Sequence, residues 1–182
     1  MATAAQSDAL DNSGAVLLIS LYRKRAKRYD RSALLLYFAG FRHWAYRKHS
    51  IRSLTLNRGD TVVDVGCRTG LDFSLLQQQV GPLGRIIGVD LTDAMLDEAA
   101  ARIAADRWSN VELVNSDVAA YVFPSVVDGI LSTFALTLVP QFDEVIRNGA
   151  LALQPGKRFV ILDFKMPSGW FLNKAAPLLA SS

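Results

Sequence analysis

The feature that most constrains the fold is the ten-residue stretch Thr61–Gly70, TVVDVGCRTG. Its β-branched run ends in Asp64 and stops at Gly66, a pattern that predicts a buried strand feeding a tight turn into a helix. Glycine in such a turn lets the backbone approach a ligand that a Cβ would exclude. Asp90 ends the next apolar run, RIIGVD, where a carboxylate can bind the hydroxyls of a ribose. Together these features predict a nucleoside-binding α/β domain.

Strands and helices alternate along the chain after this point. We predict strands over residues 61–65, 85–89, 111–114, 126–132 and 158–163, and helices over 71–79, 93–106 and 141–153. Alternation of this kind predicts a doubly wound, mostly parallel sheet. The length of 182 residues favours one domain.

Three acidic residues lie at the carboxyl ends of three successive predicted strands, namely Asp64, Asp90 and Asp117. Because the carboxyl ends of parallel strands meet at one edge of a sheet, we expect these acids on one rim, beside the glycine turn. Tight packing alone would explain a glycine turn, and a solvated strand end would explain a single acid. The combination favours a ligand site.

Basic charge is concentrated near the N-terminus. Between Tyr22 and Arg52 lie ten of the twenty Lys and Arg residues and one acid, Asp30. Helical patterns there carry aromatic residues between the cations, as is typical of helices at an anionic membrane surface. Packing of these helices on the sheet edge, with their basic faces in solvent, is an alternative. Nucleic-acid binding is less favoured, because only the charge supports it. We therefore predict a disordered tail (1–14), a basic aromatic helical arm (15–52) and a ligand-binding domain (53–182).

The cysteine content and the apolar runs bear on location. The single cysteine, Cys67, excludes an intrachain disulfide framework and is typical of a reducing compartment. No secretory signal and no run long enough for a bilayer span is visible. We predict a cytoplasmic protein that is peripheral at the membrane, and we predict no metal site.

Five segments occur in the order and spacing of class I S-adenosylmethionine-dependent methyltransferases: VVDVGCRTG, GVDLTDAMLDEAA, VELVNSDV, DGILSTFALTLVP and LALQPGKRFVILDF. The chain resembles this family over about Arg52–Asp163. The resemblance implies a Rossmann-like fold and S-adenosylmethionine as cofactor. The chain departs from the family pattern at residue 68, where it has Arg68 and the family usually has glycine. At a positive φ an arginine there would cost about 1 kcal/mol.

The resemblance also implies which residues bind the cofactor. The loop from Gly66 to Gly70, with Cys67 in it and Asp64 before it, would hold the methionine portion. Asp90 would bind the ribose hydroxyls, with Leu91 against the adenine. Asp117 would accept a hydrogen bond from the adenine amino group, and Val118 would offer its backbone N–H. Ser132 and Thr133 would face the methionyl end and the reacting methyl.

A narrower resemblance extends into the basic arm. Tyr22…Ala26…Tyr29-Asp30, the aromatic and basic helix after it, and DFKMPSGW at 163–170 are similar to bacterial phosphatidylethanolamine N-methyltransferases and their quinone-methylating relatives. This resemblance implies that the N-terminal helix docks on membrane and helps close over the cofactor. Tyr22 and Tyr29 would take part in that closure, and packing in an amphipathic core is the alternative for both.

We predict from these features an S-adenosylmethionine-dependent methyltransferase that methylates a phospholipid amine at the membrane surface. A quinone or another small-molecule acceptor is one alternative, and a non-catalytic cofactor- or lipid-binding remnant is another. An NAD-linked oxidoreductase would need G-x-G-x-x-G, which the loop does not supply. Transfer from a sulfonium needs alignment and desolvation more than an acid or base. We identify no catalytic residue, and we interpret His43 and His49 as surface residues.

The C-terminal part of the sequence is short for this family, whose sheet has seven strands. Nineteen residues follow Asp163, too few for a further helix and two strands. The strand at 158–163 is therefore predicted to be an apolar edge. We expect residues 164–182, or a second chain in a homo-oligomer, to cover it.

Overall fold

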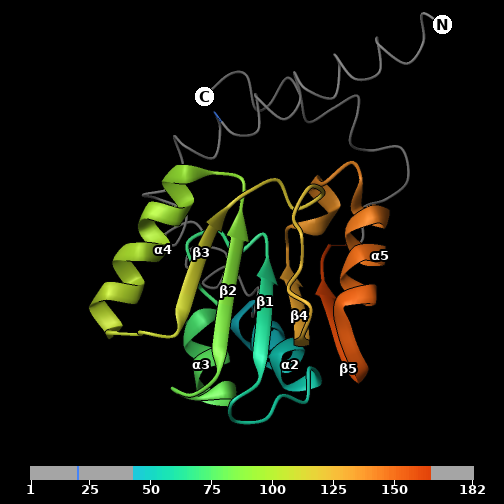
Figure 1. Cartoon of the computed structure of the whole chain (residues 1–182). Helices are drawn as coiled ribbons and strands as arrows, with labels where there is room; N and C mark the ends of the chain where they lie inside the picture. The colour runs from blue at the N-terminus through green and yellow to red at the C-terminus, as the bar shows by residue number, and fades with distance from the viewer. Residues whose placement is uncertain (1–19, 21–42, 165–182) are drawn as a thin grey trace, which may run out of the picture.

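The computed structural model describes residues 43–164 and the single residue Ser20. In this range, helices lie on both faces of one five-stranded sheet (Figure 1). The predicted tail, most of the predicted arm with Tyr22 and Tyr29, and residues 165–182 lie outside the described residues. No helix of the described part is long and apolar enough to span a bilayer.

The sheet is parallel throughout and has the strand order β3-β2-β1-β4-β5. Its strands are β1 (Thr61–Val65), β2 (Arg85–Asp90), β3 (Val111–Asn115), β4 (Val127–Thr133) and β5 (Leu153–Leu162). The strand order reverses on either side of β1, which lies between β2 and β4. This confirms the predicted doubly wound sheet and places its switch point at the end of β1, where ligands of open α/β sheets bind.

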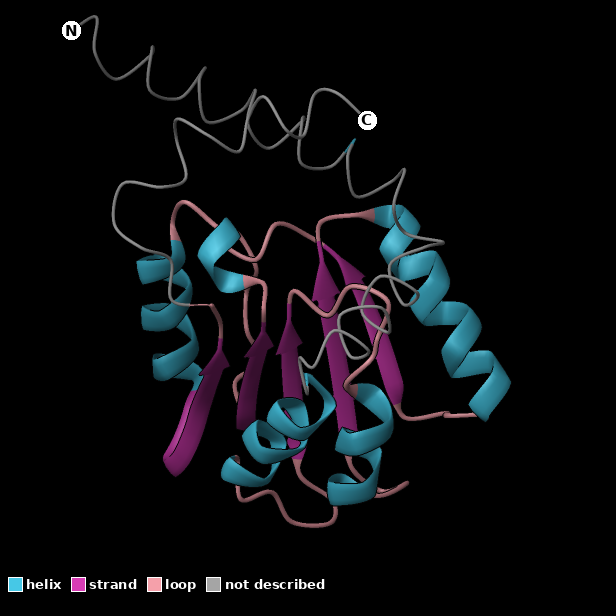
Figure 2. Ribbon diagram, turned by 180° about the vertical axis from the view of Figure 1, so that it is seen from behind, coloured by secondary structure: helices cyan, strands magenta, loops and turns pink. Residues whose placement is uncertain are grey.

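The sheet separates the hydrophobic core into two layers, and helices lie over both. The helices are α2 (His43–Ser53), α3 (Phe73–Val80), α4 (Asp93–Asp106) and α5 (Phe142–Ala152), with a 3-10 turn at Leu136–Leu138. Side chains alternate across a strand, so Val62 packs in one cluster with residues of α2, α3 and α4, while Val63 packs in the other with α5. Figure 2 shows α2 and α3 in front of the sheet when the molecule is viewed from behind.

One face of the sheet is covered partly by irregular chain. The β3–β4 connection contains no helix, and its residues Val118, Tyr121 and Phe123 pack in the cluster that contains α5. The rings of Tyr121 and Phe123 meet edge to face, with centroids 5.0 Å apart. This segment therefore forms the core layer beside α5 and carries Val118 to the rim.

The fifth strand differs from the prediction. The Gln154-Pro155-Gly156 sequence was expected to separate a helix from a strand at 158, but the strand already begins at Leu153. Val127 pairs with Leu153 and Gly129 with Arg158, so the extra residues form a bulge, with Gly156 at φ +79°. A proline is tolerated there because β5 pairs only with β4 among the described strands. The covering of this edge by residues 164–182 or a second chain stays a prediction.

Helix α2 packs directly on the sheet. Ile51 is 1% exposed in the core, and Arg158 of β5 donates a hydrogen bond to the Ser53 carbonyl oxygen at 2.9 Å. The predicted boundary after residue 52 falls in the last turn of this helix. The described end of the arm is therefore tied to β5.

Candidate cofactor site

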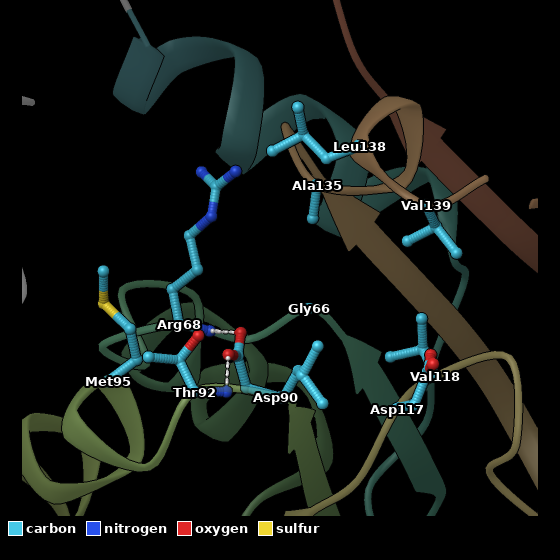
Figure 3. A pocket seen from close by; sticks show the side chains of 11 residues that line it. Gly66, Arg68, Asp90, Thr92, Met95, Asp117, Val118, Ala135, Leu138 and Val139 are labelled. Carbon is cyan, nitrogen blue, oxygen red and sulfur yellow. Dashed lines mark hydrogen bonds between the residues drawn. The ribbon is translucent and has the colours of Figure 1, made fainter. Parts of the chain in front are cut away.

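A pocket opens at the carboxyl ends of the strands, beside the switch point (Figure 3). Its cavity volume is about 110 Å³, and it is partly open to solvent. Its lining residues are Gly66, Arg68, Asp90, Leu91, Thr92, Met95, Asp117, Val118, Ala135, Leu138 and Val139. Most of these side chains are apolar, and the charged groups are few.

The turn after β1 is tied to β2 and touches the loop after β4. The backbone N–H groups of Gly66 and Cys67 both donate to the Val89 carbonyl oxygen, at 2.8 and 3.0 Å. Gly66 has φ +71°, and a Cβ on it would lie 2.5 Å from the Ala135 Cβ. Glycine is required here by the backbone conformation and by the contact with Ala135.

Asp90 presents its carboxylate to the pocket from the last position of β2. One oxygen accepts the backbone N–H of Arg68 and the other accepts that of Thr92, each at 2.9 Å. Burial raises the pKa of the Asp90 carboxyl, and these two hydrogen bonds oppose that rise. Because a carboxylate has about four acceptor positions, two remain for hydroxyl groups of a ligand.

Arg68 adopts the conformation that makes its presence costly. Its φ is +52°, in the left-handed region, where a residue with a side chain costs about 1 kcal/mol. Its backbone N–H binds Asp90, and its guanidinium donates to the carbonyl oxygen of Phe134 in the loop after β4. These contacts offset the strain and link the two loops that border the pocket.

The opposite end of the pocket is formed by the chain after β3. Asp117 is exposed and accepts a hydrogen bond from the backbone N–H of Ala119 at 2.9 Å. Val118 is buried beside it, and Leu91 and Val139 complete apolar walls that suit a flat base. The residues present fit the nucleoside part of S-adenosylmethionine, since the Asp90 carboxylate could accept from ribose hydroxyls and the apolar walls could hold the base.

Five of the predicted site residues line this pocket, namely Gly66, Asp90, Leu91, Asp117 and Val118. Five others do not, namely Asp64, Cys67, Gly70, Ser132 and Thr133. All five of these are buried in the interior. At Gly70 a Cβ would lie 2.5 Å from the Phe73 ring, so this glycine permits close packing.

A buried polar network lies behind the pocket. Arg47 Nη1 of α2 donates to Asp72 Oδ2 at 2.5 Å and to Thr133 Oγ1 at 2.6 Å, and Thr133 donates to the same Asp72 oxygen at 2.6 Å. The Arg47 guanidinium also lies 5.4 Å from the centre of the Phe134 ring. Interpretation of the arm as a solvated or membrane-facing basic surface is thus wrong for Arg47, whose charge is paired inside the protein.

Thr133 also has a different role from the expected one. Its hydroxyl was expected to face the reacting methyl, but it is 3% exposed and bonds to Arg47 and Asp72. Because Thr133 ends β4 and Phe134 follows it, the network fixes the start of the loop that carries Ala135. Arg47 and Asp72 were not among the predicted site residues.

Asp64 is the fourth of the five residues of β1 and is fully buried rather than on the rim. Neither carboxylate oxygen has a hydrogen-bond partner among the described residues. Burial, together with the charge of Asp72, raises the pKa of the Asp64 carboxyl well above its ordinary value. The folded protein therefore holds this proton at pH values where the unfolded chain has lost it.

Replacing Asp64 by asparagine is expected to make stability less dependent on pH. Between the ordinary pKa of aspartate and the raised pKa of Asp64, the folded state binds more protons, so stability falls as pH rises. The isosteric amide removes this contribution. Urea unfolding from about pH 4 to about pH 8 measures it, with the exposed Asp106→Asn variant as control. Equal slopes in the Asp64→Asn variant and the parent would contradict the assignment.

Several pocket residues were missed by reasoning from the sequence. Thr92 and Met95 follow Asp90 within the segment GVDLTDAMLDEAA. Their position at the start of the next helix, directly after Asp90, could have predicted that they lie beside its carboxylate. Leu138 and Val139 belong to ALTLVP, an apolar run directly after β4. Apolar residues so close to a strand end at the switch point indicate a pocket wall.

Comparisons with known proteins identify the family of the chain. The model of the ubiE/COQ5 methyltransferase family matches residues 12–180. The chain is 28% identical over 154 residues to the demethylmenaquinone methyltransferase of Listeria monocytogenes, covering 82% of this chain and 64% of that protein. It is 33% identical over 149 residues to the 2-phytyl-1,4-naphtoquinone methyltransferase of Thermosynechococcus vestitus, covering 81% and 64%. The chain thus spans 64% of the length of these curated relatives.

The fold is shared with solved structures. A S-adenosylmethionine-dependent methyltransferase from Aquifex aeolicus superposes with a TM-score of 0.60 at 23% identity, over 65% of this chain and 64% of that one. This likeness concerns the fold. The family match extends over nearly the whole chain and includes the pocket. The chain belongs to the ubiE/COQ5 methyltransferase family.

Proposed function

We propose that this chain binds S-adenosylmethionine in the pocket around Asp90 and transfers its methyl group to a ring of the quinone class. The observation that carries the proposal is the position of Asp90. Its carboxylate lies at the switch point, between the glycine turn and apolar walls. A ribose and a base have their complementary groups there.

The acceptor follows from the relatives. The two proteins named above are methyltransferases of demethylmenaquinone and of a phytyl naphthoquinone. Neither is named for a phospholipid, so we replace the predicted phospholipid amine by the alternative acceptor, a quinone. In its reduced form such a ring has hydroxyl groups, and loss of a proton from one makes a neighbouring ring carbon nucleophilic.

The residues of this chain would act by binding and orientation. Asp90 would hold the ribose hydroxyls, Val118 and Val139 would contact the base, and Gly66 would let the backbone approach the donor. The donor supplies an electrophilic methyl group on a sulfonium when bound. Alignment of acceptor and methyl, together with exclusion of water by the apolar lining, accounts for most of the expected acceleration.

The acceptor can be tested by following the methyl group. The full chain would be incubated with methyl-labelled S-adenosylmethionine and either a reduced demethylated naphthoquinone or vesicles of phosphatidylethanolamine. The proposal expects label in the naphthoquinol and none in the lipid. Label in the phospholipid, or in neither acceptor, would overturn it.

We also propose that α2 contacts an anionic membrane, where quinones with long tails reside. Trp44 and Tyr46 are 40% and 51% exposed, and Lys48 and Arg52 are exposed on the same helix. Aromatic rings beside cations suit the headgroup region of a bilayer. The spacing of four residues places Trp44, Lys48 and Arg52 along one side of the helix.

Reversing Lys48 and Arg52 to glutamate is expected to weaken binding to anionic vesicles about thirty-fold or more, because each basic residue near the surface contributes about 1 kcal/mol. Co-sedimentation with vesicles containing phosphatidylserine measures the effect. The matched control reverses Arg107 and Arg147, which are exposed on other helices or their ends. Equal binding of the two double variants would rule out α2 as the membrane contact.

A further inference from the structure

The pocket presents three chemically different groups in sequence along its length. Figure 3 shows Asp117 and Val118 at one end, Asp90 in the middle, and Arg68 with Met95 at the other end. A ligand that fills this pocket meets apolar walls, then a buried carboxylate, and then a guanidinium. The first two groups suit a base and a ribose, as argued above. The third suits an anion.

The side chain of Arg68 is held so that its charge reaches the pocket. Its backbone is fixed by the hydrogen bond from its N–H to Asp90, and its guanidinium binds the Phe134 carbonyl oxygen, a neutral group. Since a guanidinium has five N–H donors, the bond to Phe134 is compatible with a bond to a ligand. Burial raises the pKa of Asp90, and the nearby charge of Arg68 is one of the influences that oppose this rise.

The strained backbone of Arg68 indicates that its side chain has a function that glycine could not perform. Arginine at φ +52° is strained, whereas glycine would adopt this conformation at no steric cost. Arg68, the strained residue, also lines the ligand pocket. A residue that is unfavourable for the backbone and directed to a ligand site is expected to serve that ligand.

We propose that Arg68 binds the carboxylate of the amino-acid portion of S-adenosylmethionine and of its product, S-adenosylhomocysteine. This inference rests on the proposed function and assigns it a residue for ligand recognition. Arginine matches the planar geometry of a carboxylate and stays charged at every physiological pH. A glycine at this position could not make the contact through a side chain.

The test compares two ligands that differ in the amino-acid portion. 5′-Methylthioadenosine has the nucleoside and the thioether of S-adenosylhomocysteine but carries no carboxylate. Calorimetric titration of the full chain would use both ligands with the parent, Arg68→Met, Arg68→Lys and Arg68→Gly, and adenosine 5′-monophosphate would be titrated as a phosphate-bearing comparison. Arg107→Met is the matched control, because Arg107 also has a positive φ, +56°, and lies at the C-terminal end of α4, outside the pocket.

The proposal expects Arg68→Met to weaken S-adenosylhomocysteine binding about ten- to hundred-fold, the range for loss of a charged hydrogen bond. Binding of 5′-methylthioadenosine should stay unchanged, and Arg68→Lys should recover part of the loss. Arg107→Met should alter neither ligand. Thermal unfolding of each variant would verify that it is folded before the titration.

Three results would overturn the inference and leave the proposed function intact. The first is an equal loss for both ligands, which would mean that Arg68 acts only through the shape of the loop. The second is tighter binding of S-adenosylhomocysteine to Arg68→Gly, which would mean that strain relief exceeds the contact. The third is a selective loss for adenosine 5′-monophosphate instead, which would assign Arg68 to a phosphate. Failure of the parent to bind either thioether would instead refute the proposed function.

Discussion

Replacing Arg47 by methionine is expected to lower the free energy of unfolding by about 3–5 kcal/mol, the typical cost of removing one partner of a buried ion pair. The Arg47 and Asp72 side chains are 5% and 2% exposed, and Arg47 Nη1 lies 2.5 Å from Asp72 Oδ2. Methionine fills the space but leaves the Asp72 carboxylate buried beside Asp64. Urea unfolding monitored by circular dichroism measures the change.

Two further variants separate the ion pair from general packing. Removing both charges with Arg47→Met and Asp72→Asn together is expected to cost less than the sum of the single changes, because no charge is left without its partner. Lys48→Met is the matched control on the same helix, since Lys48 is exposed, and it should stay within about 0.5 kcal/mol of the parent. An Arg47→Met variant as stable as Lys48→Met would contradict the role given to the network.

Replacing Asp90 by asparagine is expected to weaken binding of S-adenosylhomocysteine about hundred-fold or more. The carboxylate would accept both ribose hydroxyls, and each charged hydrogen bond contributes about 1.5–3 kcal/mol. Asparagine keeps one oxygen for one of the two backbone N–H groups that donate to Asp90, so the loop loses less than in an alanine variant. Calorimetric titration gives the affinity.

The matched control for Asp90 is Asp97→Asn, an exposed position on α4. It removes the same charge from a neighbouring element and should leave binding unchanged. If Asp90→Asn and Asp97→Asn bound the ligand equally well, the ribose would have another partner. A loss confined to Asp90→Asn would support the assignment made from the geometry.

The sequence correctly predicted those helices and strands whose bounds depend on residues close to them in the chain. The predicted strand over 61–65 and the predicted helix over 93–106 match their structural bounds, because the β-branched run and the helix start after Thr92 are visible within a few residues. The fifth strand was mispredicted at its start, since Pro155 and Gly156 are turn residues in most settings. Here pairing with β4 extends across them as a bulge.

Long-range pairing explains what the sequence could not show. Arg47 and Thr133 are 86 residues apart and meet only because α2 packs where β4 ends. Nothing near Arg47 in the sequence distinguishes it from the exposed Lys48 beside it. The positive φ of Arg68 likewise depends on the bonds of its loop to Asp90 and Phe134.

The methyl acceptor is the part of the function for which the relatives favour the alternative prediction, a quinone, over the first one, a phospholipid amine. The rim residues Asp90 and Asp117 report on a nucleoside, and they are silent about the methyl acceptor. The aromatic and basic arm is equally compatible with a lipid headgroup and with a quinone whose tail lies in the membrane. Only similarity along the chain to quinone methyltransferases favours the second.

Titration of the full chain with S-adenosylhomocysteine is the most direct test of the central claim, that the pocket around Asp90 holds the methyl donor. The account predicts saturable binding of one ligand per chain, displaced by S-adenosylmethionine and weakened by Asp90→Asn. Absence of binding heat and of any thermal stabilisation at millimolar ligand would contradict it.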